Sequence, residues 1–572
     1  MNKTVITLIS FFLTLPLWAQ EDKKKNDFDD FIKEANKDFD NFIDSATQDF
    51  IQFMRDPWTQ LNAESPVEKR KKPEPVEPTV YDPTQGDVGN DIPICLNIDA
   101  ILDQSTEEGK QRPTTKVNDI DDIFSDLPDD PTVIRKKPTV VVVEEEEKVV
   151  TPKAQPISQQ VPDEDTPSQQ PAEPPSEEAP AAMPNVSPVA PASTPANTPA
   201  TSPALDTNRA LYAGGSNRSK FVYAGNTYYL SNQLKGTCAL SGVSESNVAD
   251  AYEKLSQSSY SPLVNDLKEL KSNQLINDWM TCMLVKEVAQ AYCSSTNAAT
   301  LMRYFLLSEL GYKTRLARKA TGSELVLFIN VDCQLYGCIY ITVDGQKYYD
   351  VENKTTYSFL VLQADAPKSK AQVSMAVNSP IPAGGSSTTN IHQAKGSSAV
   401  VCAPVPTQLM DVYSSYPQCD YQVYVTAAVN TTVAEAILTP LAEQVKGKSE
   451  ADAANLLLNF VQTGFEYATD DQQFGYEKPF FVEELFYYPY CDCEDRSALY
   501  GYLVKNLLGL DVVYLDYPDH IATAVHFTTD PGGDYFNVGG KRYTICDPTY
   551  IGASIGMTIP QYRSASCTIL KY

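Results

Sequence analysis

Residues 63–208 constrain this chain more than any other feature, because their composition cannot build a packed core. The segment is rich in Pro, Glu, Thr, Ser and Ala, as in KRKKPEPVEP, VVVVEEEEKVV and SPVAPASTPANTPATSPA. Such segments bury too little apolar surface to offset the entropy lost on ordering, and they behave as extended linkers. We therefore expect 63–208 to be a disordered Pro/Glu/Thr-rich linker. One apolar island, IPICLNIDAIL around Cys95, is interpreted as a local binding element.

Length and charge exclude several classes of protein. The 572 residues are enough for two or three domains, and the chain carries 40 prolines and a formal net charge of −28. Binding to nucleic acid needs clustered Lys and Arg, and the sequence has neither a basic stripe nor a Gly-rich phosphate loop. We therefore expect no nucleic-acid partner.

Residues 1–19 have the pattern of a signal peptide. Lys3 supplies the positive charge, VITLISFFLTLPLW is the apolar run, and Ala19 precedes the expected cut. The run is short for a membrane span, although an uncleaved anchor is the alternative interpretation. We expect an exported protein of the periplasm or cell envelope, or a secreted one, with no membrane span after signal removal.

Residues 26–62 are predicted to form a Phe-rich amphipathic helix. Phe28, Phe39 and Phe50 are spaced eleven apart, as is a second row that starts at Phe31 and ends at Phe53. Eleven residues make three helical turns, so both rows lie on one face, and Pro57 is expected to stop the helix. The apolar face either docks a protein partner or a second copy of the chain, or packs against the chain's own folded region. Binding to a membrane surface is less favoured because the polar face is acidic.

The remaining sequence predicts an α+β protein with two folded regions, over 211–375 and 403–572. They are separated by a Gly/Ser-rich linker over 376–402, which includes NSPIPAGGSSTTNIHQAKGSS. The C-terminal region begins with a strand-like run, DYQVYVTAAV. Two helical patterns follow, SEADAANLLLNFVQTGFEY and DCEDRSALYGYLVKNLLG, and Gly509 is expected to stop the second. Four strand-like runs follow, which together form an α+β pattern.

Three residues of the C-terminal region suggest nucleophilic thiol chemistry. Cys493 is expected in the first turn of a helix, whose N-terminus stabilises a thiolate. His520 opens a strand and can take the thiol proton, and Asp547 ends a later strand and can orient the imidazole. Strand alternation puts His526 on the same face as His520, but about 20 Å further along the strand, so we prefer His520.

These motifs resemble the bacterial transglutaminase-like domain, which has the papain-like cysteine peptidase fold. The segments that carry the resemblance are LLNFVQTGFEYATDDQQFGYEKPFFVEEL, CDCEDRSALYGYLVKNLLGLDV, DHIATAVHF and CDPTY. The resemblance implies a catalytic triad of Cys493, His520 and Asp547. Two positions depart from the family pattern: Ala522 stands where an aromatic residue is usual, and Cys491 where glycine is frequent. The order of segments is also similar to that of a group of exported proteins associated with Bacteroidota.

Other residues near this motif have competing interpretations. Gln462 is the candidate side-chain donor to the oxyanion, because papain-like enzymes often use a Gln upstream of the cysteine; the alternative is an ordinary surface Gln. Asp495 is expected to hold backbone at the helix start. Cys491, Cys493, Cys546 and His520 could alternatively bind zinc, although their spacing is unusual for it. Cys491 could also pair with Cys546 or Cys567 in a disulfide.

The middle region, 211–375, is interpreted as a degenerate copy of the same domain. AYCSSTNAATLMRYFLLSELGY has the layout of the cysteine helix, but no histidine occurs between Cys293 and Asp350. Cys293 is therefore expected to be a core thiol rather than a nucleophile.

Together these patterns predict an exported cysteine enzyme that acts on amide bonds of proteins or peptides, with hydrolysis favoured over cross-linking. It needs no metal and no cofactor. The alternative is a catalytically silent envelope adaptor that binds through papain-like modules and docks a partner with its Phe-rich helix.

Overall fold

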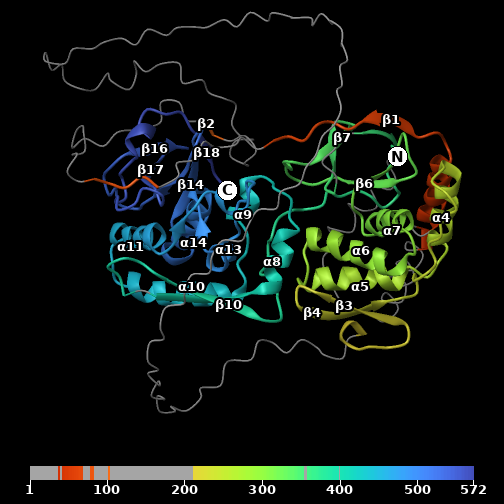
Figure 1. Cartoon of the computed structure of the whole chain (residues 1–572), viewed down its shortest axis with the longest axis horizontal. Helices are drawn as coiled ribbons and strands as arrows, with labels where there is room; N and C mark the ends of the chain where they lie inside the picture. Colours follow the sequence, from red (N-terminus) through yellow and green to blue (C-terminus); the bar gives the residue numbers. More distant parts are fainter. Residues whose placement is uncertain are drawn as a thin grey trace, which may run out of the picture. The chain divides into compact units, whose positions relative to one another are not determined.

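The structure is a computed structural model that describes residues 37–38, 41–68, 78–82, 101–102, 210–352, 357–398 and 400–572. The predicted signal peptide, the beginning of the Phe-rich segment and most of the predicted linker lie outside these residues. The described chain is a mixed α/β protein (Figure 1).

The middle region begins with a hairpin, continues with four helices and ends with five strands. The hairpin is β3 (Arg218–Tyr223) and β4 (Asn226–Ser231). The helices are α4 (Glu245–Ser256), α5 (Ser261–Ser272), α6 (Asp278–Tyr292) and α7 (Thr296–Glu309). The strands are β5 (Thr314–Lys319), β6 (Leu325–Ile329), β7 (Ile339–Val343), β8 (Gln346–Asp350) and β9 (Ser358–Val361).

The C-terminal region repeats this order of helices followed by a sheet. Its helices are α8 (Thr407–Ser414), α9 (Tyr421–Val425), α10 (Thr431–Val445), α11 (Glu450–Thr463), α12 (Asp470–Gln473), α13 (Val482–Tyr487) and α14 (Cys493–Leu508). Its main strands are β14 (Asp511–Asp516), β15 (Ile521–His526), β16 (Tyr535–Val538), β17 (Lys541–Cys546) and β18 (Thr568–Leu570). Two short strands, β12 (Glu466–Tyr467) and β13 (Tyr490–Cys491), pair in parallel just before α14.

The two main sheets have the same strand order. The middle sheet runs β1-β9-β5-β6-β8-β7, and the C-terminal sheet runs β2-β18-β14-β15-β17-β16. Strand β5 follows α7 along the chain, β14 follows α14, and each is the third strand of its sheet. The first strand of each sheet, β1 or β2, comes from the N-terminal segment. The two sheets differ at that edge, because β1 pairs antiparallel with β9 whereas β2 pairs parallel with β18.

The N-terminal segment differs from the prediction in two places. The helix ends at Met54, and Thr59–Asn62 form β1, so the predicted helix over 26–62 is too long. Pro57 lacks an N–H to continue the helix, and the chain beyond it pairs with β9 instead. The predicted linker also contains ordered pieces, because Tyr81 N–H donates to Ile551 O at 2.8 Å and Ile101–Leu102 form β2.

The helix over 41–54 packs against the middle region. Phe50 is buried, with its ring centroid 5.5 Å from that of Tyr252, and Arg55 forms an ion pair with Asp250 at 2.6 Å. Phe42 and Phe53 remain exposed, at 64% and 43%. Phe50, the described member of its row, therefore packs on the chain's own fold, as one of the two interpretations predicts, whereas Phe42 and Phe53 of the other row face solvent.

Residues 376–402, predicted as a linker, contain most of a β-hairpin. β10 (Ser387–Gln393) pairs antiparallel with β11 (Val400–Pro406), and α10 packs against β11. The strand β10 is polar at most of its positions, so its composition resembled that of a linker. Cross-strand pairing and packing of the hairpin hold it in place instead.

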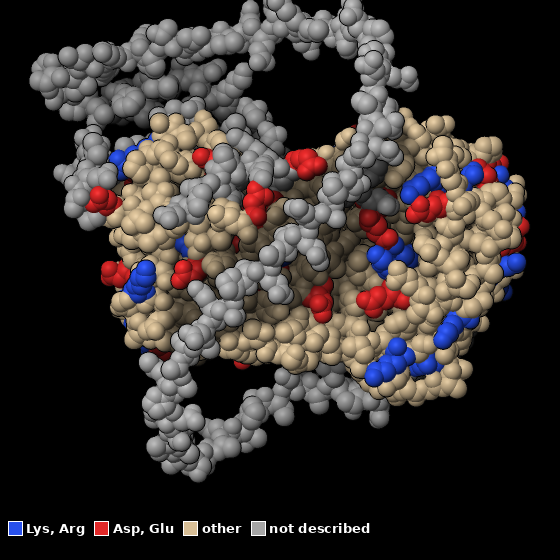
Figure 2. Space-filling model, viewed as in Figure 1, with Lys and Arg blue, Asp and Glu red and all other residues tan. Residues whose placement is uncertain are grey.

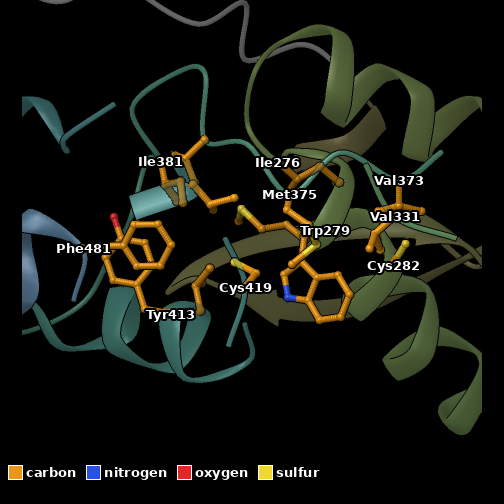
Figure 3. Close-up of a cluster of buried hydrophobic side chains, with 14 of the residues drawn as sticks. Ile276, Trp279, Cys282, Val331, Val373, Met375, Ile381, Tyr413, Cys419 and Phe481 are labelled. Carbon is orange, nitrogen blue, oxygen red and sulfur yellow. The ribbon is translucent and has the colours of Figure 1, made fainter. Parts of the chain in front are cut away.

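The middle and C-terminal regions share a buried apolar cluster. Figure 3 shows Ile276, Trp279 and Met375 on the same side of this cluster, with Tyr413 and Phe481 opposite them. Polar contacts add to it, because Trp279 Nε1 donates to Ser415 Oγ at 3.1 Å. Burial of this much aromatic and aliphatic surface favours a fixed arrangement of these elements.

Candidate active site

Cys493 is the first residue of α14, as the sequence predicts. Asp492 is the N-cap, and its N–H donates to Asp495 Oδ2 at 3.2 Å, while Asp495 Oδ1 accepts from Phe480 N–H at 2.9 Å. This confirms that Asp495 holds backbone at the helix start. The αL conformation of Gly509, with φ of 67°, ends the helix, as expected.

The Cys493 thiol has two opposing electrostatic neighbours. The N-terminus of α14 favours a negative charge at this position. The Cys493 Sγ, however, lies 3.1 Å from Glu494 Oε2, and a carboxylate at that distance disfavours the thiolate. Cys493 is 2% exposed, so neither effect is strongly screened by water.

His520 and Asp547 form a buried pair. The Nε2 of His520 lies 2.8 Å from Oδ2 of Asp547, and the two residues are 4% and 3% exposed. Thr549 N–H donates to the other oxygen, Oδ1, at 2.9 Å, which fixes the carboxylate. An ionised Asp547 accepts the proton of Nε2, and this leaves Nδ1 as the basic nitrogen of the imidazole.

One hydrogen bond joins the first turns of α14 to the start of β15, and an aromatic contact covers His520. Ser497, one turn after Cys493, donates its hydroxyl to the carbonyl oxygen of Ile521 at 3.0 Å. The ring of Tyr562 stacks on His520, with centroids 5.0 Å apart and planes within 16°. Burial raises the pKa of the Tyr562 hydroxyl. The first turns of α14 thus lie beside the start of β15, where His520 pairs with Asp547 at the end of β17.

Gln462 does not have the free amide that an oxyanion donor needs. It is 3% exposed, and its Nε2 donates to the carbonyl oxygens of Asp547, Tyr550 and Ala553 at 3.1, 2.8 and 3.1 Å. Its Oε1 accepts from Gly552 N–H at 3.2 Å. Gln462 therefore braces the loop after Asp547, and it is neither an oxyanion donor nor the surface residue of the alternative interpretation.

The structure does not gather the four residues of the zinc alternative. The Cys491 thiol donates to Glu466 O at 3.7 Å, and the Cys546 thiol donates to Thr544 O at 3.5 Å. His526, the second candidate base, has Nδ1 2.9 Å from Arg542 O, at the far end of β15 from His520. Among the described residues, no group of these cysteines with His520 lies within ligand distance, and His526 is at the other end of β15.

A buried acidic group beside Cys493 escaped the sequence analysis. Carboxylate oxygens of Asp470, Asp492 and Asp495 lie within 4.8 Å of one another, and so do those of Asp470, Glu477 and Glu494. Burial raises the pKa of Asp470 to about 10, and the charges of Asp495 and Glu494 contribute to that rise. The density of acids in CEDR and ATDD was visible, but nothing in the sequence showed that α12 and α14 meet.

Charges on the face of the molecule shown in Figure 2 are interspersed, with Lys and Arg lying among Asp and Glu. Within the stretches of chain that the structure describes, none of the helices is both long and apolar enough to cross a membrane. No family model, no curated protein and no solved structure matches this chain.

Proposed function

We propose that the protein is an exported, transglutaminase-like cysteine enzyme that attacks amide bonds of proteins or peptides. The observation that carries this proposal is the buried His520–Asp547 pair next to a helix that begins with Cys493. A thiol at a helix N-terminus, an imidazole and a carboxylate on the far ring nitrogen are the three groups that nucleophilic thiol catalysis requires.

The proposed reaction begins with proton transfer from the Cys493 thiol to Nδ1 of His520. The thiolate then attacks the amide carbonyl carbon, and the backbone N–H of Cys493 is the candidate donor to the oxyanion. His520 returns the proton to the leaving amine, which forms a thioester. Water hydrolyses the thioester in a peptidase, and a primary amine takes its place in a cross-linking enzyme. Asp547 keeps Nδ1 directed at the thiol throughout.

The strand order of the middle sheet supports the interpretation of a degenerate copy. When α7 is matched to α14 and the strands are matched by position, Thr296 takes the place of Cys493 and Glu324 that of His520. Val351 follows β8 as Asp547 follows β17. Cys293 ends α6, three residues before α7, and its thiol contacts Cys238 and Met302. The middle region therefore has none of the three groups.

The burial of the site favours the second candidate, a binding protein without turnover. Because Cys493 and His520 are 2% and 4% exposed, a substrate reaches the thiol only after covering side chains move. The exposed Phe42 and Phe53 suit the docking of a protein partner.

The experiment that separates the two candidates is turnover of a generic protein substrate. Unfolded casein is incubated with the protein, and both peptide release and incorporation of a fluorescent primary amine are followed. Cys493→Ser abolishes both signals if the proposal holds, while Cys402→Ser, which removes an exposed thiol, leaves them unchanged. Equal signals from the wild type and Cys493→Ser contradict it.

A further inference from the structure

The middle and C-terminal regions form a cleft of about 560 Å³ that the proposed reaction does not use. The middle region supplies Tyr336 and Gly337, just before β7, and the C-terminal region supplies the end of α8 and the loop between α12 and α13. Glu68, from the N-terminal segment, also lines the cleft. Three parts of the chain that are far apart in the sequence therefore build this surface.

The lining of the cleft is negatively charged. Four carboxylates and one ammonium group line it, from Glu68, Asp471, Glu477, Glu484 and Lys478, which gives a formal charge of −3. The ammonium group of Lys478 forms an ion pair with Glu484, and these side chains are only 14% and 2% exposed. Glu68 and Asp471, in contrast, are exposed. Acidic groups gathered in a cleft attract a cationic occupant.

Aromatic side chains of the cleft also suit a cation. Tyr476 is 60% exposed, so its ring is open to contact, and guanidinium and ammonium groups bind over aromatic faces. Part of the wall is fixed, because Tyr413 stacks on Phe481 with ring centroids 4.2 Å apart (Figure 3). A fixed wall lowers the entropy cost of binding.

The N-terminal segment is anchored on both sides of the cleft. On the middle region, Gly337 N–H donates to Val67 O at 2.9 Å, and Gly337 itself lines the cleft. On the C-terminal region, Ile551 N–H donates to Thr79 O at 2.8 Å. The sequence between these anchors is EKRKKPEPVEP, in which four consecutive basic residues follow directly after the glutamate that lines the cleft.

We propose that this acidic cleft is the docking surface for the chain's own basic stretch, residues 69–72 (KRKK). Four residues span at most about 14 Å, so attachment to Glu68 keeps all four basic side chains within reach of the cleft. So short a tether corresponds to an effective concentration of the order of millimolar. The other basic runs, at residues 23–25 and 135–137, are attached much further along the chain, so the tether favours 69–72.

Docking adds an ionic contact between the N-terminal segment and the C-terminal region, which supplies Asp471 and Glu477. This contact supplements the backbone hydrogen bonds of Val67 and Thr79. Because it involves charges near the surface, salt screens it and weakens it. The docking does not depend on catalysis by Cys493, so the proposed enzyme and the proposed contact can fail independently.

The test is a competition for the cleft between the chain's own stretch and a free copy of it. The probe is a fluorescein-labelled peptide KRKKP, and its binding to the full chain is followed by fluorescence anisotropy at low salt. The wild type should bind it weakly, because its cleft is occupied. The quadruple variant, in which Lys69→Gln, Arg70→Gln, Lys71→Gln and Lys72→Gln are combined, should bind the peptide at least about tenfold more tightly.

Two further pairs of substitutions locate the bound peptide. Asp471→Asn with Glu477→Gln, added to the quadruple variant, should remove the gain in affinity. Glu435→Gln with Asp530→Asn is the matched control, because both are exposed acids that do not line the cleft, and this pair should keep the gain.

Equal affinities of the wild type and the quadruple variant overturn the proposal, since the stretch then does not occupy the site of the peptide. Equal losses from the two pairs of acid substitutions also overturn it, because the peptide then senses only the net charge of the chain. Should the variants fail to fold, trypsin cleavage of the wild type decides. Cleavage within 69–72, relative to cleavage within 135–137, should rise as NaCl is increased to about 0.5 M, and an unchanged ratio contradicts the docking.

Discussion

The Nε2 of His520 lies 2.8 Å from Oδ2 of Asp547, and both side chains are buried, His520 just before β15 and Asp547 just after β17. This contact leaves Nδ1 of the imidazole as the nitrogen that can accept the thiol proton. Replacing the carboxylate with an amide should therefore release the imidazole into the wrong tautomer while leaving the fold intact.

We predict that Asp547→Asn slows alkylation of Cys493 by iodoacetamide at pH 7 by about tenfold or more, since the thiol returns to an ordinary, mostly protonated state. Peptide mapping by mass spectrometry measures the rate at each cysteine. Asp511→Asn, which removes an exposed partner of Lys541, is the control and should leave the rate unchanged. Equal rates in the wild type and Asp547→Asn would show that Asp547 does not position His520.

Gln462→Leu should unfold at lower urea concentration. The substitution removes the donors to three buried carbonyl oxygens and the acceptor for Gly552 N–H. We therefore expect the free energy of unfolding to fall by about 2–4 kcal/mol. Gln422→Leu, at an exposed position on α9, should change stability by less than about 0.5 kcal/mol. Full stability of Gln462→Leu, with loss of turnover alone, would restore the oxyanion role and contradict our assignment.

Gly501→Ala should destabilise the C-terminal region through one contact. A Cβ at this position would lie 2.3 Å from the hydroxyl oxygen of Tyr514, and such overpacking costs about 1–3 kcal/mol. Tyr514→Phe removes that oxygen and should restore most of the loss in the double variant, as urea unfolding can measure. Gly215→Ala, with no atom within 4 Å of the new Cβ, is the control. If the losses in free energy of unfolding of Gly501→Ala and Tyr514→Phe simply add in the double variant, this explanation is contradicted.

Glu483 should make the protein less stable as the pH rises. Burial, and to a lesser extent the charge of Glu484, raises the pKa of Glu483 to about 7, although its Oε1 accepts from Asn430 N–H at 2.7 Å. The folded chain then holds this proton more tightly than the unfolded chain, so stability is lost between about pH 4.5 and 7, by about 3 kcal/mol.

Glu483→Gln keeps an acceptor for Asn430 and should reduce the fall in urea stability between pH 5 and 8. Glu435→Gln, at an exposed position on α10, should not. Other buried acids also lower the free energy of unfolding as the pH rises. The slope of this free energy against pH should therefore become smaller in Glu483→Gln without vanishing. An unchanged slope in Glu483→Gln would show that this carboxyl group is ionised in the folded protein at neutral pH.

Two pairs of thiols contact each other, Cys333 with Cys419 and Cys238 with Cys293. We predict that oxidised glutathione converts both pairs to disulfides, with two electrons and two thiol protons per bond passing to glutathione. The Cys333–Cys419 bond would join the middle and C-terminal regions and could stabilise them by up to about 4 kcal/mol. Non-reducing peptide mapping should find both bonds. Mixed disulfides with glutathione at these four positions would contradict the pairing.

Much of the site follows from local sequence, because its residues occur at the ends of regular elements. The apolar spacing after Cys493 and the stop at Gly509 predicted α14 to within a residue. His520 and Asp547 flank β15 and β17, as their positions at the ends of strand-like runs suggested. The surroundings depend on contacts between distant segments. The role of Gln462 depends on a loop about ninety residues away, and the acidic group depends on where α12 meets α14.

The dependence on contacts between distant segments also explains the wrong predictions for the N-terminal segment and for the β10–β11 hairpin. The eleven-residue Phe repeat predicts a helical face but not its partner, so the burial of Phe50 and the exposure of Phe53 could not be derived. Strands β1, β2 and β10 are short or polar, and each is held by pairing with a strand distant in sequence or across a turn. The sequence analysis therefore placed β1 in a helix, and β2 and β10 in linkers.

The most direct test of the central claim is the rate at which iodoacetamide alkylates Cys493 at pH 7 in the wild type, His520→Ala and His526→Ala. An activated nucleophile predicts that Cys493 reacts faster than the exposed Cys402, that His520→Ala slows it about tenfold or more, and that His526→Ala does not. A Cys493 that reacts more slowly than Cys402 and is indifferent to His520→Ala would contradict the enzyme and favour the binding protein.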